Sequence, residues 1–305
     1  MPLYKPQDWF SEIKVIGKLT PLRAAEKLME IGEVKAAEEI RRSKKAFFSK
    51  SLWPGSDKPK PWQHTSHAFG FIPIANVRSS KLVDIDHAGS IQPDLSLKNS
   101  RIKITLDRLR VFDYPGDGVH HILFDFYAQN QVQGQTEHLH FNQIYRVQEG
   151  EQASIIGYPT FVGLNVGSEG VAFKCYTVNV KNDDDQRLLE FLDSDIFKDG
   201  LKLINTVNPV VPIISSFAIS FTKMIASRNK NIPVQDFYMG LDFTHIPTRA
   251  RLAQGSYISV QIPDVGKWDW SKWKYNPANG QIVSEDEPTI TIPYNYLVFS
   301  VSKYD

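Results

Sequence analysis

The feature that most constrains the fold is a hydrophobic period of two, which begins about a hundred residues into the chain. Ile102, Ile104 and Leu106 alternate with polar residues, and the phase then shifts by one position, as a β-bulge requires. Further strand-like runs, separated by turn residues, lie at 119–131, 137–147, 161–166, 171–180, 234–243, 255–262 and 289–302. Many short strands separated by turns are typical of antiparallel sandwiches and barrels. We therefore predict a mainly β fold, an antiparallel β-sandwich of residues 100–305.

Helical patterns interrupt and precede these strands. Residues 186–205 and 210–227 predict helical insertions, and residues 1–50 predict an N-terminal helical hairpin whose first helix starts at Thr20-Pro21. If the hairpin packs on the body of the protein, Leu28, Met29, Ile31 and Ile40 should be buried. If it docks a partner, its apolar face should stay partly exposed. Residues 51–99 are rich in proline and tryptophan and predict an irregular connection, in which residues 69–77 are a candidate strand.

The composition excludes several classes of protein and of site. The 35 Lys and Arg residues nearly balance the 34 Asp and Glu residues, and this net charge of +1 gives no overall field for holding nucleic acid. Cys175 is the single cysteine, so the chain has neither an internal disulfide nor a cysteine-based zinc site. We find no signal-peptide pattern and no uninterrupted apolar run of membrane-spanning length. These features favour localisation in the cytoplasm, which is a reducing compartment.

Two acidic stretches carry a family resemblance. "LRVFDYPGDG" (109–118) and "YTVNVKNDDD" (176–185) resemble loops of the calcium-dependent lipid-binding β-sandwich of synaptotagmin and protein kinase C. The resemblance implies a Ca²⁺ site with Asp113, Asp117, Asn182 and Asp184 as ligands, and with Asp193 or Asp195 as a fifth. Ca²⁺ takes six to eight oxygen ligands, which such loops supply. A sandwich of the same shape without a metal is the alternative.

Histidines supply a second candidate site. His138 and His140 stand two apart in a predicted strand, so both project from the face opposite to Leu139 and Phe141. With His64, His67, His87, His120 or His121, this pair is the start of a metal site of an enzyme. Two surface histidines are the simpler interpretation. The sequence has no nucleophile elbow or phosphate loop, and it assigns no catalytic residue.

The most apolar window spans residues 210–226. On a helix, Ile213, Phe217, Phe221 and Met224 form one stripe, and Pro212 suits the first turn. We predict a helix packed on the sandwich. The alternative is a segment that inserts into a membrane after a conformational change.

An aromatic segment, "KWDWSKWKYN" (267–276), supplies the last candidate site. Trp268, Trp270, Trp273 and Tyr275 are interleaved with lysines, and such side chains stack on sugars or lie at a membrane interface. The alternative interpretation is that these aromatic side chains cover a hydrophobic core.

Together these patterns predict a non-enzymatic binding or adaptor protein that contacts a membrane or a protein partner through acidic tip loops. The alternatives are a metal-assisted hydrolase that uses the outward histidines and nearby carboxylates, and a glycan-binding module that uses Trp268 to Tyr275. No nucleic acid partner is expected.

Overall fold

The structure is a computed structural model that describes residues 12–42, 59–77, 81–132, 135–153, 155, 157–192, 220–244 and 250–304. The strands of the larger sheet are β1 (Ser66–Pro73), β3 (Asp86–His87), β4 (Arg101–Arg110), β7 (Tyr158–Asn165), β11 (Gly255–Ile262) and β14 (Tyr296–Tyr304). Those of the second sheet are β5 (Val119–Val132), β6 (Gln135–Gln148), β8 (Gly170–Val180), β9 (Ile232–Asp242) and β10 (Ala250–Arg251). A small third sheet holds β2 (Val83–Asp84), β12 (Trp273–Asn276) and β13 (Gln281–Ser284).

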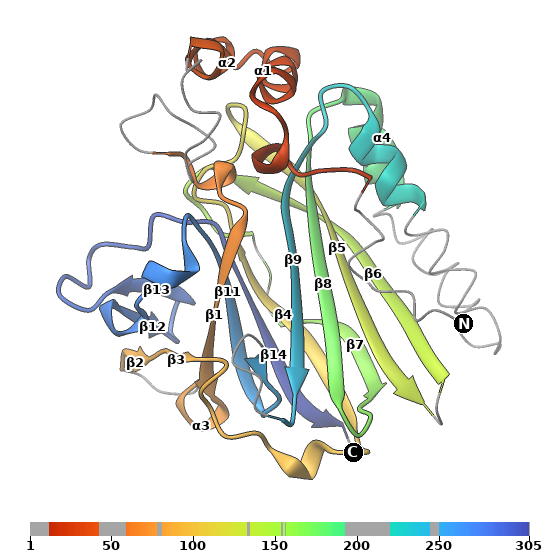
Figure 1. Cartoon of the computed structure of the whole chain (residues 1–305), viewed down its shortest axis with the longest axis vertical. Coiled ribbons are helices and arrows are strands. Elements are labelled where there is room, and N and C mark those ends of the chain that lie inside the picture. Colours follow the sequence, from red (N-terminus) through yellow and green to blue (C-terminus); the bar gives the residue numbers. More distant parts are fainter. Residues whose placement is uncertain are drawn as a thin grey trace.

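The two large sheets form the predicted β-sandwich (Figure 1). Their strand orders are β3-β1-β11-β14-β4-β7 and β10-β9-β8-β5-β6, and all pairs are antiparallel except the two-residue β10 beside β9. The phase shift after Leu106 is a register shift between β4 and β14, as the sequence predicts. The mainly β, antiparallel fold is therefore confirmed.

The main core lies between the two sheets and is built around Phe126 of β5. Its ring stacks on Phe173 of the same sheet, with centroids 5.3 Å apart. It also meets Phe161 and Phe299 of the opposite sheet, at centroid distances of 5.9 and 5.5 Å. These side chains come from one face of each strand, which explains why alternation identifies them.

The helices lie at both ends and on the outer faces of the sandwich, with α1 and α2 at the top of Figure 1 and α3 at the bottom. They are α1 (Pro21–Glu30), α2 (Val34–Arg42), α3 (Ile74–Val77), α4 (Asp183–Leu192) and a helix whose described part is 220–227. Short 3-10 helices occur at Ile16–Lys18, Pro61–Gln63, Leu95–Leu97, Val265–Lys267 and Trp270–Lys272. Within the described part of the chain, no helix is long and apolar enough to cross a membrane.

The N-terminal hairpin consists of α1 and α2. Thr20 caps α1 by accepting a hydrogen bond from the Arg23 backbone N–H at 3.5 Å, and Pro21 occupies the first turn. Leu28 and Ile40 are buried in the main core, whereas Met29 is 41% exposed. The hairpin is thus packed on the body along a narrower face than the sequence predicts.

The predicted connection at 51–99 is more ordered than its prolines suggest. β1 lies within it and pairs along its full length with β11, in the middle of the larger sheet. A proline at the last position of the strand, Pro73, is compatible with this pairing. The prediction that the sandwich begins at residue 100 is therefore wrong, because its first long strand begins at Ser66.

Candidate functional site

The structure brings the two predicted calcium loops to the same end of the sandwich, here called the tip. The first loop, 111–118, joins β4 to β5, and the second follows β8. β5 and β8 are antiparallel neighbours, and His121 lies opposite Val180, so the start of one strand adjoins the end of the other. The predicted proximity of the loops is therefore observed, and it is the side chains that decide whether a metal fits.

Asp113 is engaged by the protein itself. Its carboxylate lies 3.6 Å from the Lys60 Nζ, and its backbone is held by the buried amide of Asn295. Burial raises the pKa of Asp113 to about 6, although Lys60 opposes the shift. The Asp113 carboxylate is therefore already paired with Lys60.

Lys181 lies between the two predicted ligand pairs. Its Nζ donates to the backbone oxygens of Asp117 at 2.9 Å and Val119 at 3.3 Å. Its aliphatic chain packs against Gly116, where φ is +92°. Burial lowers the pKa of Lys181, against the attraction of the carboxylates of Asp117 and Glu33. An ammonium group therefore lies against the first loop, beside the predicted ligand Asp117.

Asn182 and Asp184 serve the start of α4 instead. The Asn182 Oδ1 accepts the backbone N–H groups of Asp184 and Asp185 at 3.1 and 3.2 Å, which is the geometry of a helix N-cap. The Asp184 side chain is exposed and faces Arg187. No group of three His, Cys, Asp or Glu among the described residues is placed to hold a metal ion. Asp113, Asp117, Asn182 and Asp184 thus share a tip without converging, and Asp193 and Asp195 lie outside the described residues.

This arrangement predicts that millimolar Ca²⁺ leaves the melting temperature unchanged. A ligand that binds only the folded state raises the melting temperature, but the Lys181 ammonium repels a divalent cation at this place. Differential scanning fluorimetry with Ca²⁺ and with a chelator measures the effect. A rise that Asp184→Asn abolishes would contradict this account and restore the calcium site.

The tip does contain a pocket, of about 790 Å³, formed where the hairpin meets the sheet ends. The tip pocket is lined by Glu30, Ile31, Gly32, Glu33, Val34, Lys35, Gly116, Asp117, Lys181 and Lys230. Hydrogen bonds brace its walls: the Gly116 N–H donates to Glu33 at 3.1 Å, and the Lys230 N–H donates to Glu30 at 2.9 Å. The four chain segments of this pocket are therefore held in one arrangement.

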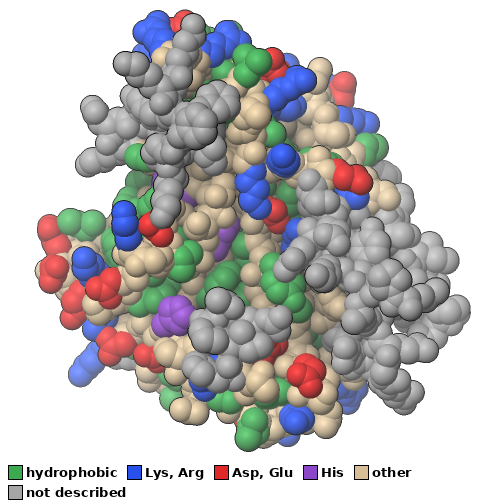
Figure 2. All heavy atoms as spheres, in the orientation of Figure 1, with side chains coloured by type: hydrophobic (Ala, Val, Ile, Leu, Met, Phe, Trp, Pro, Cys, Tyr) green, Lys and Arg blue, Asp and Glu red, His purple; other side chains and the backbone are tan. Residues whose placement is uncertain are grey.

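Charges of both signs line the tip pocket, but they are not equally available. Glu30 is paired with Lys27 at 3.0 Å, and the Glu33 carboxylate accepts the Gly116 N–H. The side chains of Lys35 and Lys230 make no ion pair or hydrogen bond with any described residue. Figure 2 shows basic and acidic side chains crowded over the hairpin at the top of the molecule.

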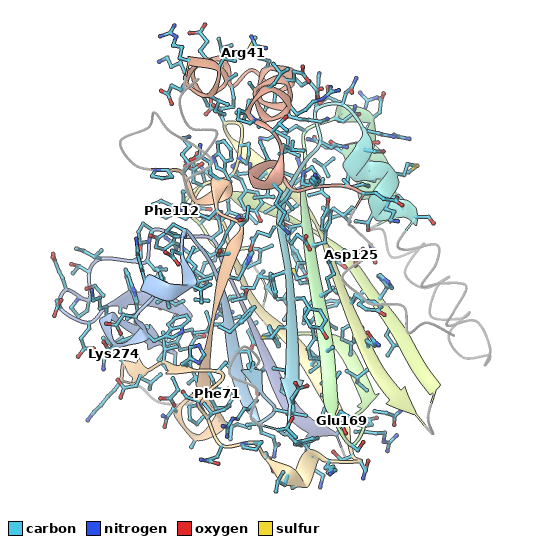
Figure 3. All side chains as sticks on the ribbon, viewed as in Figure 1. Arg41, Phe71, Phe112, Asp125, Glu169 and Lys274 are labelled. Carbon is cyan, nitrogen blue, oxygen red and sulfur yellow. The ribbon has the colours of Figure 1, made fainter. Side chains whose placement is uncertain are left out.

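The histidine prediction is half right. Leu139 and Phe141 pack on the main core, so His140 points outward as alternation requires. Its side chain is nevertheless fully buried, and its Nδ1 lies 3.1 Å from a carboxylate oxygen of the equally buried Asp125. Figure 3 labels Asp125. The expectation of a surface histidine is wrong for His140, and the side chain of His138 lies outside the described residues.

The helix at 220–227 covers this part of the sheet. The Thr222 hydroxyl donates to Asp125 at 2.7 Å, and the Asn142 amide donates to both Asp125 and Thr222. The apolar side of the helix is offset from the predicted stripe, because Ile225 is buried while Met224 is 38% exposed. The predicted core helix is observed for these eight residues. Ile213 and Phe217 lie outside the described residues.

The tryptophan segment builds a second core. Trp270 and Tyr275 are buried with Ile258 and Val298, between the three-stranded sheet and the outer face of the larger sheet. Trp268 and Trp273 are partly buried at the rim, with parallel rings 6.1 Å apart. Two of the four predicted ligand-binding aromatics are therefore inaccessible to a ligand.

Three buried histidines predict sensitivity to acid. Burial lowers the pKa values of His64, His67 and His120 to about 4. Between pH 6.5 and about 4 the unfolded chain then binds protons that the folded chain does not, so the free energy of unfolding falls as pH falls. For the buried His67 the lowered pKa corresponds to about 3 kcal/mol. His67→Leu should therefore lose less stability than the parent from pH 7 to pH 4, as measured by urea denaturation at each pH. A difference between the two proteins that does not change with pH would contradict this assignment.

Comparison of the chain with family models, with curated proteins and with solved structures finds no match.

Proposed function

We propose that this chain is a non-enzymatic binding protein that docks a protein partner at the tip pocket, without a metal. The proposal rests on one observation, which is the set of partners that the three pocket lysines have. Lys35 and Lys230 lack a carboxylate partner among the described residues, and Lys181 donates its two hydrogen bonds to backbone oxygens. The carboxylates of Glu30 and Glu33 are engaged in bracing the walls. Lys35 and Lys230 therefore leave two ammonium groups available beside the carboxylate of Asp117, and these ammonium groups suit an acidic peptide segment.

Apolar side chains beside the pocket favour a protein partner. Val34 lines the pocket and is 45% exposed, and Met29, next to the lining residue Glu30 on α1, is 41% exposed. Protein interfaces combine such apolar contacts with a polar rim. Charge complementarity then sets the orientation and the rate of association.

The test uses an array of immobilised 12-residue peptides of acidic, basic and mixed composition, followed by titration calorimetry of the tightest binder. We expect acidic peptides to bind, with an affinity that falls as salt rises. The double variant Lys35→Glu/Lys230→Glu should weaken binding at least tenfold. Lys98→Glu is the matched control, because Lys98 is exposed and precedes β4, at the opposite end of the sandwich from the tip.

Two results would contradict the proposal. One is equal binding by the parent and the double variant. The other is binding to vesicles of anionic lipid with no binding to any peptide, which would favour a membrane surface as the partner.

A further inference from the structure

A second feature, outside the lining of the tip pocket, is a buried arginine with almost no partners. Arg110 of β4 is 5% exposed. Its Nη2 donates to the Thr291 hydroxyl at 3.3 Å, and its Nε is buried without a hydrogen-bond partner. Among the described residues no carboxylate lies within ion-pair distance of this guanidinium. A buried charge is costly unless it is paired, so this arginine lacks the anion that usually accompanies one.

Arg108 accompanies it on the same face of β4. The two arginines lie opposite Val298 and Tyr296 of β14, beside the three-stranded sheet that Figure 1 shows at the left. The Arg108 Nη1 donates to the backbone oxygens of Asp107 and Ile155, both at 2.8 Å. It too has no carboxylate within ion-pair distance among the described residues. Arg108 is half-buried, so its side chain is reached by solvent while that of Arg110 lies beneath the surface.

The turn between β12 and β13 is shaped to leave room for this pair. Gly280 has a φ of +71°, and a Cβ at this position would collide with the Arg108 side chain. A hydroxyl and an amide complete the surroundings: the Tyr296 hydroxyl donates to the Gly280 oxygen, and the Gln152 amide donates to that hydroxyl. Asp107 is an acid whose charge acts on Arg108, and burial raises its pKa to about 6. The neighbourhood therefore offers two guanidinium groups, neither of which is held in an ion pair with a described residue.

We propose that Arg108 and Arg110 form a binding site for an oxyanion, a carboxylate or phosphate group of a small ligand. A guanidinium offers its N–H groups in a planar fork that matches two oxygens of such an anion. The anion supplies the missing countercharge and partners for the unpaired Nε. This site is independent of the tip pocket and of the function proposed for it.

Titration calorimetry and thermal shift with inorganic phosphate and with malonate, at constant ionic strength set by chloride, test the proposal. We expect saturable binding of at least one anion and a higher melting temperature. Phosphate alone would indicate a phosphorylated ligand, and malonate a carboxylate ligand. Arg110→Met should abolish the binding, and Arg110→Lys, which keeps the charge without the fork, should weaken it about tenfold.

Arg101→Met is the matched control, because Arg101 lies at the other end of β4, over the ring of Tyr304. It should bind the anions as the parent does, and so should Lys181→Met in the tip pocket. In chloride alone, Arg110→Met should melt at a higher temperature than the parent, because it removes an unpaired buried charge. The proposal is overturned by the absence of saturable binding of both anions, by binding that survives in Arg110→Met, or by a lower melting temperature of Arg110→Met in chloride.

Discussion

Replacing Asp125 by alanine should lower the free energy of unfolding by about 3–5 kcal/mol, because the change leaves buried polar partners uncompensated. The two carboxylate oxygens hold three side chains from two other elements: His140 at 3.1 Å, Thr222 at 2.7 Å and Asn142 at 3.3 Å. The side chains of Asp125 and His140 are fully buried, so water does not replace the lost contacts. Urea denaturation at neutral pH measures the change.

Two milder variants show whether the network is the cause. Asp125→Asn keeps the shape and one acceptor oxygen, so it should cost less than alanine. Thr222→Val removes one donor and should cost about 1–3 kcal/mol. A loss below about 1 kcal/mol for Asp125→Ala would mean that the helix at 220–227 is not anchored to the sheet through this carboxylate.

The second large effect is expected for Trp270→Ala, which should destabilise the fold by about 3–5 kcal/mol. The indole is 6% exposed and lies in the second core with Ile85 and Ile258. It also closes over Gly70 of β1, where a Cβ would lie 2.9 Å from the ring. Truncation therefore opens a cavity between the three-stranded sheet and the larger sheet, and equilibrium urea denaturation measures the loss.

Trp273→Ala is the matched comparison, because Trp273 is only partly buried at the rim of the same cluster. It should cost less than Trp270→Ala. If Trp270→Ala leaves stability unchanged, the segment does not serve the core, and the interpretation as a glycan-binding surface regains support.

The strands could be predicted from the sequence because alternation reports directly on burial. β11 spans the predicted residues 255–262, and β5, β6 and β8 start and end within two residues of their predicted limits. β14 starts at Tyr296, seven residues after the predicted start at 289, because the chain before it forms turns. β12 and β13 were not predicted, since the aromatic residues of this segment carry no clear period.

The candidate site could be predicted only in part. The sequence indicates that the loops after β4 and β8 matter, and the structure places both at the tip. It does not indicate that Lys181 lies between them, because that follows from the pairing of β5 with β8. Nor does it connect the turn after α1 with Lys230, about two hundred residues away, although the two meet through Glu30.

The histidine face shows the same limit. Alternation correctly predicts which way His140 points, but it carries no information on what lies over the outer face of a sheet. Thr222 reaches Asp125 from a helix about eighty residues further along the chain than Asn142. Only the three-dimensional structure shows which distant segment packs over the outer face of a sheet.

Amide hydrogen exchange of the full chain, alone and with the tightest-binding acidic peptide of the array, tests the tip pocket most directly. The account predicts slower exchange in residues 30–35 and 116–119 and around Lys230, with no change in the three-stranded sheet. Slower exchange confined to β12 and β13, with the tip unchanged, would contradict it.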